Sequence, residues 1–398
     1  MKTKLFALAL ATGLFLNSCS SSDDPTPAPT PATGEITGSI TANKTYAYGN
    51  YTLKGIVKIN SGVTVTFEAG STITIDKATG DNALVVLKGG KLITQGTADK
   101  PVVFTEKSKL PGSWGGIIVY GDAPAKVAGG GTTGTSEDGN KISYGGANAT
   151  DNSGSLVYTR VEYAGSKLAD GEKENNGFTF YSVGSGTVLD HLVSYKGADD
   201  GFEFFGGTVS MTNAISYGNY DDAFDWQDGW QGTINTNWYA YQTGKGNYGM
   251  EIEASLNDNS FGPKVSNITL KREAGNVPEV GDNQVDAFQF KREGNGEYSN
   301  IVIDGYGNFT TTTGTITTYK GSAVSILDAA TNDHQVKTSK IKLLNVKITN
   351  TTNVTPIGAT DAIVVAFPTG TFTPSTTATG ASLTAGAWAT VDGVNLIK

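Results

Sequence analysis

The sequence predicts an all-β protein built as a β-solenoid, in which short strands of successive coils stack through their backbones. Two observations predict this fold. The 398 residues include 52 Gly, are rich in Thr, Ser, Asn and Val, and contain no long stretch with helical apolar spacing. Aromatic pairs also recur every 22–26 residues, an interval that suits one coil of about three short strands and their turns.

The net charge of −9 restricts the classes of molecule that the protein is expected to bind. A negative protein is a poor match for nucleic acid and for anionic lipid surfaces. It is compatible with bound cations. We therefore expect no nucleic-acid partner.

Residues 1–18 are predicted to be a signal peptide, because Lys2 and Lys4 precede the apolar run LFALALATGLFL. Cys19 is the only cysteine, which excludes a disulfide within the chain. The stretch Leu16-Asn17-Ser18-Cys19 resembles a bacterial lipobox, and that resemblance implies cleavage before Cys19 and its acylation. The alternative is an ordinary signal peptide in which Cys19 has no role.

Residues 19–34 are predicted to be a lipidated cysteine followed by a flexible tether. Ser20 to Asp24 resemble the surface-export signals of Bacteroidetes lipoproteins. The Pro-rich stretch PTPAPTPATG then favours an extended chain. Together these features imply a protein anchored in the outer membrane by its lipid, with its folded part facing the cell exterior.

The coils of the solenoid are predicted to span residues 35–355. A leucine-rich repeat has a similar period but needs a leucine and asparagine framework that is missing, and a β-propeller needs a longer repeat. A β-sandwich would not keep aromatics at one interval. The aligned positions are Phe178, Phe202, Phe224, Met250 and Phe288 in one series, and Phe180, Phe204, Trp226, Ile252 and Phe290 in the other.

Phrases in the first half identify the type of solenoid. The stretches GIVKINSGVTVTFEAGSTITID and GSWGGIIVYGDAP resemble the opening coils of bacterial right-handed parallel β-helix proteins of the pectin-lyase-like class. That class includes adhesins, lyases and hydrolases, so the resemblance implies a fold rather than an activity.

Two segments depart from the repeat. The Gly-rich stretch 126–154 is predicted to be a long loop leaving the solenoid, and such loops are often functional. Residues 356–398 lose the period and are predicted to cap the last coil, which would protect its exposed edge.

Strand alternation assigns the acidic residues to the outer surface. If the aromatic pairs point inward, the residues between and after them point outward. Neighbouring coils would then stack carboxylates ~5 Å apart, where they repel one another. The predicted outward ladder consists of Thr179, Glu203, Asp225, Glu251 and Gln289, with Phe205, Gln227 and Glu253 on the same face.

A bound cation would relieve this repulsion. Ca²⁺ takes six to eight oxygens in irregular geometry, and the Asp pairs at the strand starts could supply them. The alternative is that the pairs shape turns by accepting backbone N–H groups. The candidate metal ligands are Asp199, Asp200, Asp221, Asp222 and Asp225.

Aromatic residues near the acids suggest a glycan as ligand. Trp226 and Trp114 are expected in the interior, whereas Trp230, in the turn QDGWQG, is the best candidate for an exposed ring. The predicted ligand-binding residues are Glu203, Phe205, Asp225, Gln227, Trp230, Glu251, Glu253 and Arg292.

Catalysis is the competing interpretation. The Asp doublets resemble those of polygalacturonases, but Asn175-Asn176 stands where that family's acidic coil is expected, and neither His191 nor His334 is in register. A Ca²⁺-dependent lyase could use Arg292 or Arg272 as base. No arrangement singles out a catalytic pair. We therefore expect a surface lipoprotein that binds a polysaccharide or another surface protein. The alternatives are a lyase or hydrolase, or an adhesin or accessory subunit of an outer-membrane complex that uses loop 126–154 as its contact.

Overall fold

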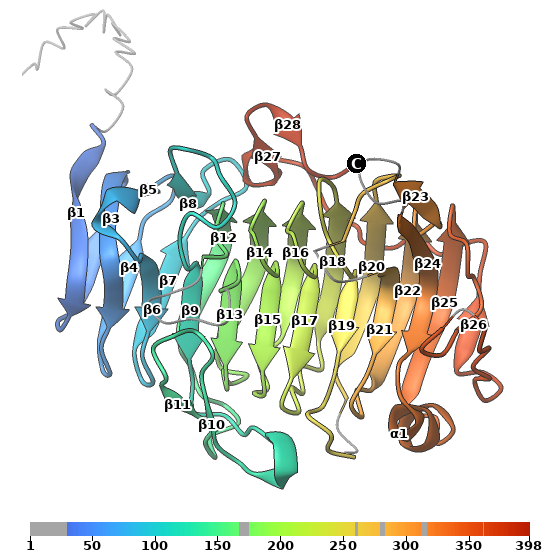
Figure 1. The fold of residues 1–398 in the computed structure, drawn as a ribbon. Coiled ribbons are helices and arrows are strands. Elements are labelled where there is room, and N and C mark those ends of the chain that lie inside the picture. The colour runs from blue at the N-terminus through green and yellow to red at the C-terminus, as the bar shows by residue number, and fades with distance from the viewer. Residues whose placement is uncertain (1–29, 167–174, 259–261, 279–282, 312–316, 361) are drawn as a thin grey trace, which may run out of the picture. The chain divides into compact units, whose positions relative to one another are not determined.

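A computed structural model describes residues 30–166, 175–258, 262–278, 283–311, 317–360 and 362–398 (Figure 1). The predicted signal peptide, 1–18, and Cys19 lie outside these residues. Within the described residues, 24 strands form one mostly parallel sheet. This sheet winds into stacked coils and confirms the predicted parallel β-helix. Among the same residues, no helix is long and apolar enough to cross a bilayer.

The first of three strand rows, row one, contains the strands that carry the aromatic pairs and the equivalent strands of the coils before and after them. Figure 1 shows its members side by side from β9 to β21. Each strand pairs in parallel with the equivalent strand one coil away. The members are β6 (Ala83–Val86), β9 (Ile117–Tyr120), β13 (Phe178–Tyr181), β15 (Phe202–Phe205), β17 (Phe224–Gln227), β19 (Met250–Ile252), β21 (Gln284–Phe290) and β24 (Thr317–Ile326).

Longer strands form the other two rows, because each bends at a residue of positive φ. The first half of β12 (Gly154–Glu162) pairs with β7 (Lys91–Gln95) in row two, and its second half pairs with β8 (Val102–Glu106) in row three. The bend falls at Tyr158, with φ of 48°. In β14 (Val188–Tyr195) the bend falls at His191, with φ of 54°, and in the later strands Asn takes this place, since its short polar side chain tolerates the left-handed region. These strands are β14 (Val188–Tyr195), β16 (Met211–Tyr217), β18 (Asn235–Gln242), β20 (Lys264–Arg272), β22 (Gly296–Asp304) and β25 (Ile341–Thr349).

The solenoid begins earlier than predicted. β1 starts at Ala32, inside the segment 19–34 that we assigned to the tether. The backbone N–H of Ala32 donates to Tyr48 O at 2.9 Å, and Ile36 is buried in the core. These contacts fix the strand along its neighbour. The opening strands are β1 (Ala32–Ile40), β2 (Lys44–Tyr46), β3 (Gly49–Ile59), β4 (Thr64–Phe67) and β5 (Thr72–Ile75).

The interior is a set of stacked aromatic columns. Phe178 and Phe202 have ring centroids 5.1 Å apart and planes within 4°, and Phe202 stacks on Phe224 at 5.5 Å. In the second column Phe180 stacks on Phe204 at 5.1 Å. The predicted inward direction of both aromatic series is confirmed, since all these side chains are buried.

Short elements lie outside the rows. Residues 126–145, here the hairpin segment, contain a 3₁₀ turn at Ala128–Gly130 and the antiparallel pair β10 (Gly134–Thr135) and β11 (Ser143–Tyr144). The other short elements are the 3₁₀ turns Lys77–Thr79 and Ala387–Ala389, β23 (Phe309–Thr311), α1 (Ala329–Thr331), the π turn Asn332–Val336, β26 (Phe372–Pro374), β27 (Thr390–Val391) and β28 (Val394–Asn395).

The C-terminal residues do more than cap. β26 pairs with β25 and so extends the last coil. Residues 381–398, here the C-terminal strap, then run back along row three. Trp388 and Leu396 of the strap pack with Val193 and Ile215, whose side chains point away from the interior. The strap therefore covers an apolar outer surface several coils before the end of the solenoid.

Candidate functional site

The predicted acidic ladder lies on the outer face of row one. Glu203 pairs in register with Thr179 on one side and Asp225 on the other, and Asp225 pairs with Glu251. Glu251 in turn pairs with Gln289. In-register parallel stacking brings equivalent side chains of adjacent coils close together. The structure therefore confirms the order of the ladder, and Thr179, Glu203, Asp225 and Glu251 line a groove outside the apolar core, whereas Gln289 is not among the described residues that line it.

The Asp residues at the strand starts shape turns. Asp200 Oδ1 accepts the backbone N–H of Asp222 at 2.8 Å, and Asp222 Oδ1 accepts the backbone N–H of Tyr248 at 2.8 Å. Each carboxylate thus bonds to the next coil through one oxygen. The turn-forming interpretation is confirmed for both residues. It does not exclude a ligand at Asp200, whose second oxygen takes no part in this bond.

The hairpin segment and row one enclose a groove. Its volume is about 610 Å³, and the described residues that line it include nine carboxylates and two bases. Such a concentration of one charge requires either protonation or a cationic partner. The charged lining residues are Glu137, Asp199, Asp200, Glu203, Asp221, Asp225, Asp228, Glu251, Glu253, Lys291 and Arg292, and the remaining polar wall includes Asn175, Asn176, Tyr144, Tyr181 and Gln227.

Aromatic stacking and hydrogen bonds hold the hairpin segment on the solenoid. Tyr144 packs on Tyr181 with ring centroids 4.9 Å apart, and its hydroxyl donates to the Asp228 carboxylate. Tyr120 Oη donates to Asp138 Oδ2 at 2.5 Å. Asn257 Nδ2 donates to the carbonyl oxygen of Val127 at 2.9 Å. The segment is therefore fixed on the solenoid at several separate points.

Burial and like charges raise the pKa values of the groove carboxyls. For Asp225, burial is the main cause, and Glu251 and Glu203 add to it, so its pKa lies well above the usual range. The pKa of Asp200 is raised in the same way by burial and then by Asp199. The ionised forms of these groups at neutral pH are therefore unfavourable.

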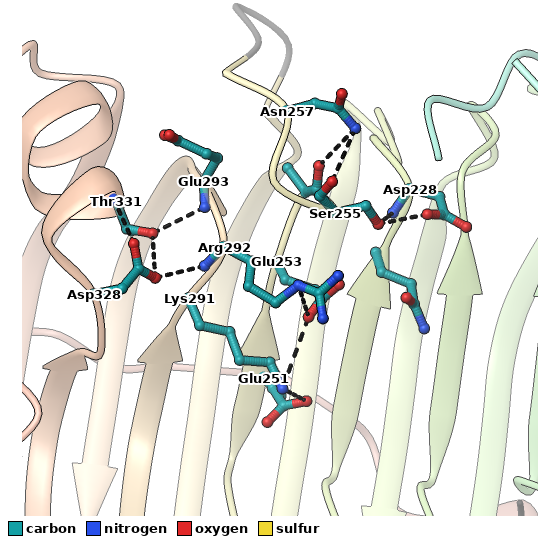
Figure 2. A network of polar contacts seen from close by, with 12 residues as sticks. Asp228, Glu251, Glu253, Ser255, Asn257, Lys291, Arg292, Glu293, Asp328 and Thr331 are labelled. Atoms are coloured by element: carbon teal, nitrogen blue, oxygen red, sulfur yellow. Dashed lines mark hydrogen bonds and ion pairs between the residues drawn. The ribbon is translucent and has the colours of Figure 1, made fainter. Parts of the chain in front are cut away.

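The bases occupy one end of the ladder (Figure 2). Lys291 Nζ lies 2.6 Å from Glu251 Oε2 and 3.8 Å from Glu253 Oε2, and Arg292 Nε lies 3.4 Å from the same Glu253 oxygen. Burial alone would lower the pKa of Lys291, but Glu251 and Asp225 outweigh it and raise that pKa. Lys291 is therefore held as an ammonium ion. The pKa of Glu253 is raised by burial, which exceeds the opposing effect of both bases.

Two trios of carboxylates have a spacing that suits a metal ion. One oxygen from each of Asp199, Asp200 and Asp221 lies within 4.8 Å of the others, and the same holds for Asp200, Glu203 and Asp225. Four of the five predicted metal-ligand residues thus stand in at least one trio. Glu203 joins them, although we predicted it only as a ligand-binding residue.

Several oxygens at the groove lack partners within the described residues. Asn175 Oδ1, Asn176 Oδ1 and Asp225 Oδ1 are buried and accept no hydrogen bond. All three residues line the groove. A buried acceptor without a partner is uncommon in folded proteins and calls for an explanation.

The structure contradicts the predicted exposure of Trp230. The side chain is 1% exposed and stacks on Phe204 at 4.4 Å, and its Nε1 donates to Val209 O at 3.0 Å. Asp228 and Gly229 both have positive φ and turn the chain back toward the interior. Alternation does not extend through such a turn, so the prediction that Trp230 binds ligand is wrong.

Phe205 points outward as predicted but is not accessible. Tyr181 stacks on it at 4.4 Å and Tyr144 of the hairpin segment lies against it at 6.0 Å. Only 2% of the residue is exposed. Phe205 therefore supports the hairpin segment and is not available to contact a ligand.

Arg272 is also excluded from the groove. It is buried, and it donates to Asn247 O at 3.1 Å and Asn276 O at 2.7 Å. Burial lowers its pKa to about 10. Arg272 is not among the residues that line the groove, so it is not a candidate base there. Arg292 does line the groove, as do Glu203, Asp225, Gln227, Glu251 and Glu253 from the predicted ligand-binding set.

Sequence reasoning missed the groove aromatics and two acids. Tyr181 follows Phe180 in β13, so the alternation that exposed Glu203 could have placed it outward. Tyr144 and Glu137 come from the Gly-rich segment, where no periodic pattern signals direction. Asp228 lies in the turn that also misled the assignment of Trp230.

A family model described as a pectate-lyase-like beta helix domain matches residues 34–391, which covers the described coils except for the first two residues of β1. No curated protein and no solved structure matches the chain.

Proposed function

The chain belongs to the family of pectate-lyase-like beta helix domains, and from that premise we propose that the groove on row one binds a glycan. The observation that carries the proposal is the composition of this groove of about 610 Å³, which is lined mainly by carboxylate and amide oxygens. Sugar hydroxyls donate hydrogen bonds to such oxygens.

We also propose that Ca²⁺ takes part in this binding. The raised pKa values of Asp200 and Asp225 indicate that their ionised forms are disfavoured without a partner. A hard cation with oxygen ligands would relieve that repulsion. Lys291 forms ion pairs with Glu251 and Glu253, and its charge only partly offsets the raised pKa of Asp225.

The proposed location is the outer membrane surface. It depends on Cys19, whose sequence context favours lipidation and whose acyl chains would anchor the protein. Mass spectrometry of the membrane-derived protein should find acyl groups on the N-terminal Cys19. Processed chains whose N-terminus is an unmodified residue after position 19 would contradict the lipid anchor.

Glycan binding is testable with named polysaccharides. Affinity electrophoresis against polygalacturonate, alginate and xylan, with and without CaCl₂, should retard the parent protein on at least one of them. Glu251→Gln should reduce this retardation, whereas Glu297→Gln, a change on β22 outside the groove, should not. Equal mobility of parent and Glu251→Gln on every retarding polymer would contradict the proposal.

Catalysis remains a second candidate because of Glu253. This residue is 7% exposed, its Oε1 has no hydrogen-bond partner within the described residues, and its pKa is raised. A carboxyl of raised pKa that lines the groove beside Lys291 and Arg292 is a candidate general acid. Reducing-end and unsaturated-product assays on the same polymers test this candidate. Turnover that is lost in Glu253→Gln or Arg292→Ala would favour it over binding alone.

A further inference from the structure

We propose that the groove holds two divalent cations that share Asp200, rather than a single ion. This inference rests on the proposed cation binding at the same groove. The first position would use Asp199, Asp200 and Asp221. The second would use Asp200, Glu203 and Asp225, and so reaches from the strand starts onto the ladder.

The spacing of the carboxylates separates the two positions. Ca²⁺ binds oxygens at about 2.3–2.6 Å, so two oxygens on one ion lie at most about 5 Å apart. Each trio meets this limit, with its ligand oxygens within 4.8 Å of one another. Among the described residues, the five carboxylates form two such trios and not one group of five. A single ion therefore does not account for all of them.

The buried oxygens without partners provide an independent reason to expect ligands. Asn175 and Asn176 are 2% and 3% exposed, both line the groove, and the Oδ1 atom of each accepts no hydrogen bond within the described residues. Amide oxygens are hard donors that calcium sites use alongside carboxylates. Asp225 is 7% exposed, and its Oδ1 likewise accepts no hydrogen bond within the described residues.

The repeat distributes these oxygens between the two positions. Phe178 pairs with Phe202, so Asn175, three residues before Phe178, occupies the place in its coil that Asp199 occupies in the next. Equivalent residues of stacked coils lie ~4.8 Å apart, which brings Asn175 beside the first trio. Asn176 lies beside the second, since its Nδ2 donates to Glu203 Oε2.

Asp222 offers a matched control one coil along from Asp200. Its Oδ1 accepts the backbone N–H of Tyr248 at 2.8 Å. It belongs to neither trio of the described residues and does not line the groove. In Asp222→Asn the side-chain Oδ1 can still accept the backbone N–H of Tyr248. This variant should therefore retain both cations.

Calorimetry on the full chain, stripped of metal and titrated with CaCl₂, tests the number of ions. The parent should bind two Ca²⁺ per chain. Glu203→Gln and Asp199→Asn should each leave one ion, because each removes a ligand from only one trio. Asp200→Asn should lower the affinity for each of the two ions by at least about tenfold. Melting curves of every variant in EDTA identify any that fails to fold, and terbium luminescence on the folded variants repeats the count with a second probe.

The outcomes separate this inference from the proposed function. One Ca²⁺ per parent chain, lost equally in Glu203→Gln and Asp199→Asn, would overturn the two-ion arrangement and leave cation binding intact. No binding of Ca²⁺ or Tb³⁺ would overturn both. Two ions that persist in Asp200→Asn would overturn the shared role of Asp200.

Discussion

Asp225 combines several unfavourable conditions at one residue. It is buried, one oxygen has no hydrogen-bond partner among the described residues, and Glu203 and Glu251 flank it in the ladder. Positions that reduce the stability of the free protein are often kept for function. Removing the charge should therefore stabilise the metal-free protein while it impairs binding.

The metal-free Asp225→Asn variant should be more stable than the parent at pH 8, by about 1 kcal/mol. Because the folded pKa of Asp225 is raised, its contribution to the stability of the parent is fully present below the unfolded pKa of about 3.9 and is lost as pH rises through the folded value. The advantage of the variant should thus grow from pH 4 to pH 8. Urea unfolding in EDTA across this range measures it.

Asp333→Asn serves as the control for that series. Asp333 is exposed, and the hydrogen bond from Lys337 lowers its pKa. This variant should be no more stable than the parent at pH 8. An advantage of Asp225→Asn that stays constant with pH would contradict the charge-based explanation.

The side of the sheet to which each side chain points could be predicted wherever a strand was regular. The alternation Phe202-Glu203-Phe204 was sufficient to place Glu203 on the ladder, and the structure agrees. The same rule failed at Trp230, because backbone turns at Asp228 and Gly229 reset the direction of the side chain. Phe205 was placed outward correctly, but its cover comes from a segment about sixty residues upstream, a contact that no local pattern encodes.

At the scale of elements, the hairpin segment forms one wall of the groove. Its own strands are only two residues each, so contacts with the solenoid must hold it. Tyr144 makes the central contact through its ring and its hydroxyl. The shape of the groove therefore depends on this side chain together with the hydrogen bonds of Tyr120 and Asn257 to the same segment.

Tyr144→Phe should loosen the hairpin segment without unfolding the solenoid. A hydrogen bond to a charged group contributes about 1.5–3 kcal/mol, so amides of the segment should exchange about tenfold faster or more. The backbone N–H of Ser136, which donates to Ile142 O at 2.8 Å, is a suitable reporter. Hydrogen exchange followed by mass spectrometry makes this measurement.

Tyr51→Phe is the matched control, since its hydroxyl donates to Ala47 O at 2.8 Å in the opening coils. It should leave exchange at Ser136 unchanged. Unaltered exchange in Tyr144→Phe as well would mean that stacking alone holds the segment.

At the scale of the whole solenoid, the coil has separate surfaces for separate tasks. Row one carries the groove, and row three lies under the C-terminal strap. Arg160 secures the strap, because its Nη1 donates to the carbonyl oxygens of Ala387 at 2.9 Å and Thr390 at 3.1 Å. The fold class could be predicted from periodicity, but the path of the strap could not, since its residues follow no repeat.

Deletion of the strap, residues 381–398, should expose the apolar side chains of Val193, Ile215 and Tyr239. Exposed apolar patches promote association. The truncated protein should melt at a lower temperature and elute as oligomers in size-exclusion chromatography with light scattering, while Ca²⁺ binding at row one is unchanged. A monomer with the melting temperature of the parent would show that the strap is dispensable.

The in-register pairing of β15 with β17 has a consequence for how such a molecule changes over generations. The two strands are separated by a single coil of 22 residues, from Asp200 to Asp222. Tandem duplication of that unit would add one more coil, and with it one more acidic residue of the ladder, without changing the pairing of the neighbouring coils. The length of the ladder, and with it the length of the groove in which we propose that a ligand binds, can therefore evolve in whole steps.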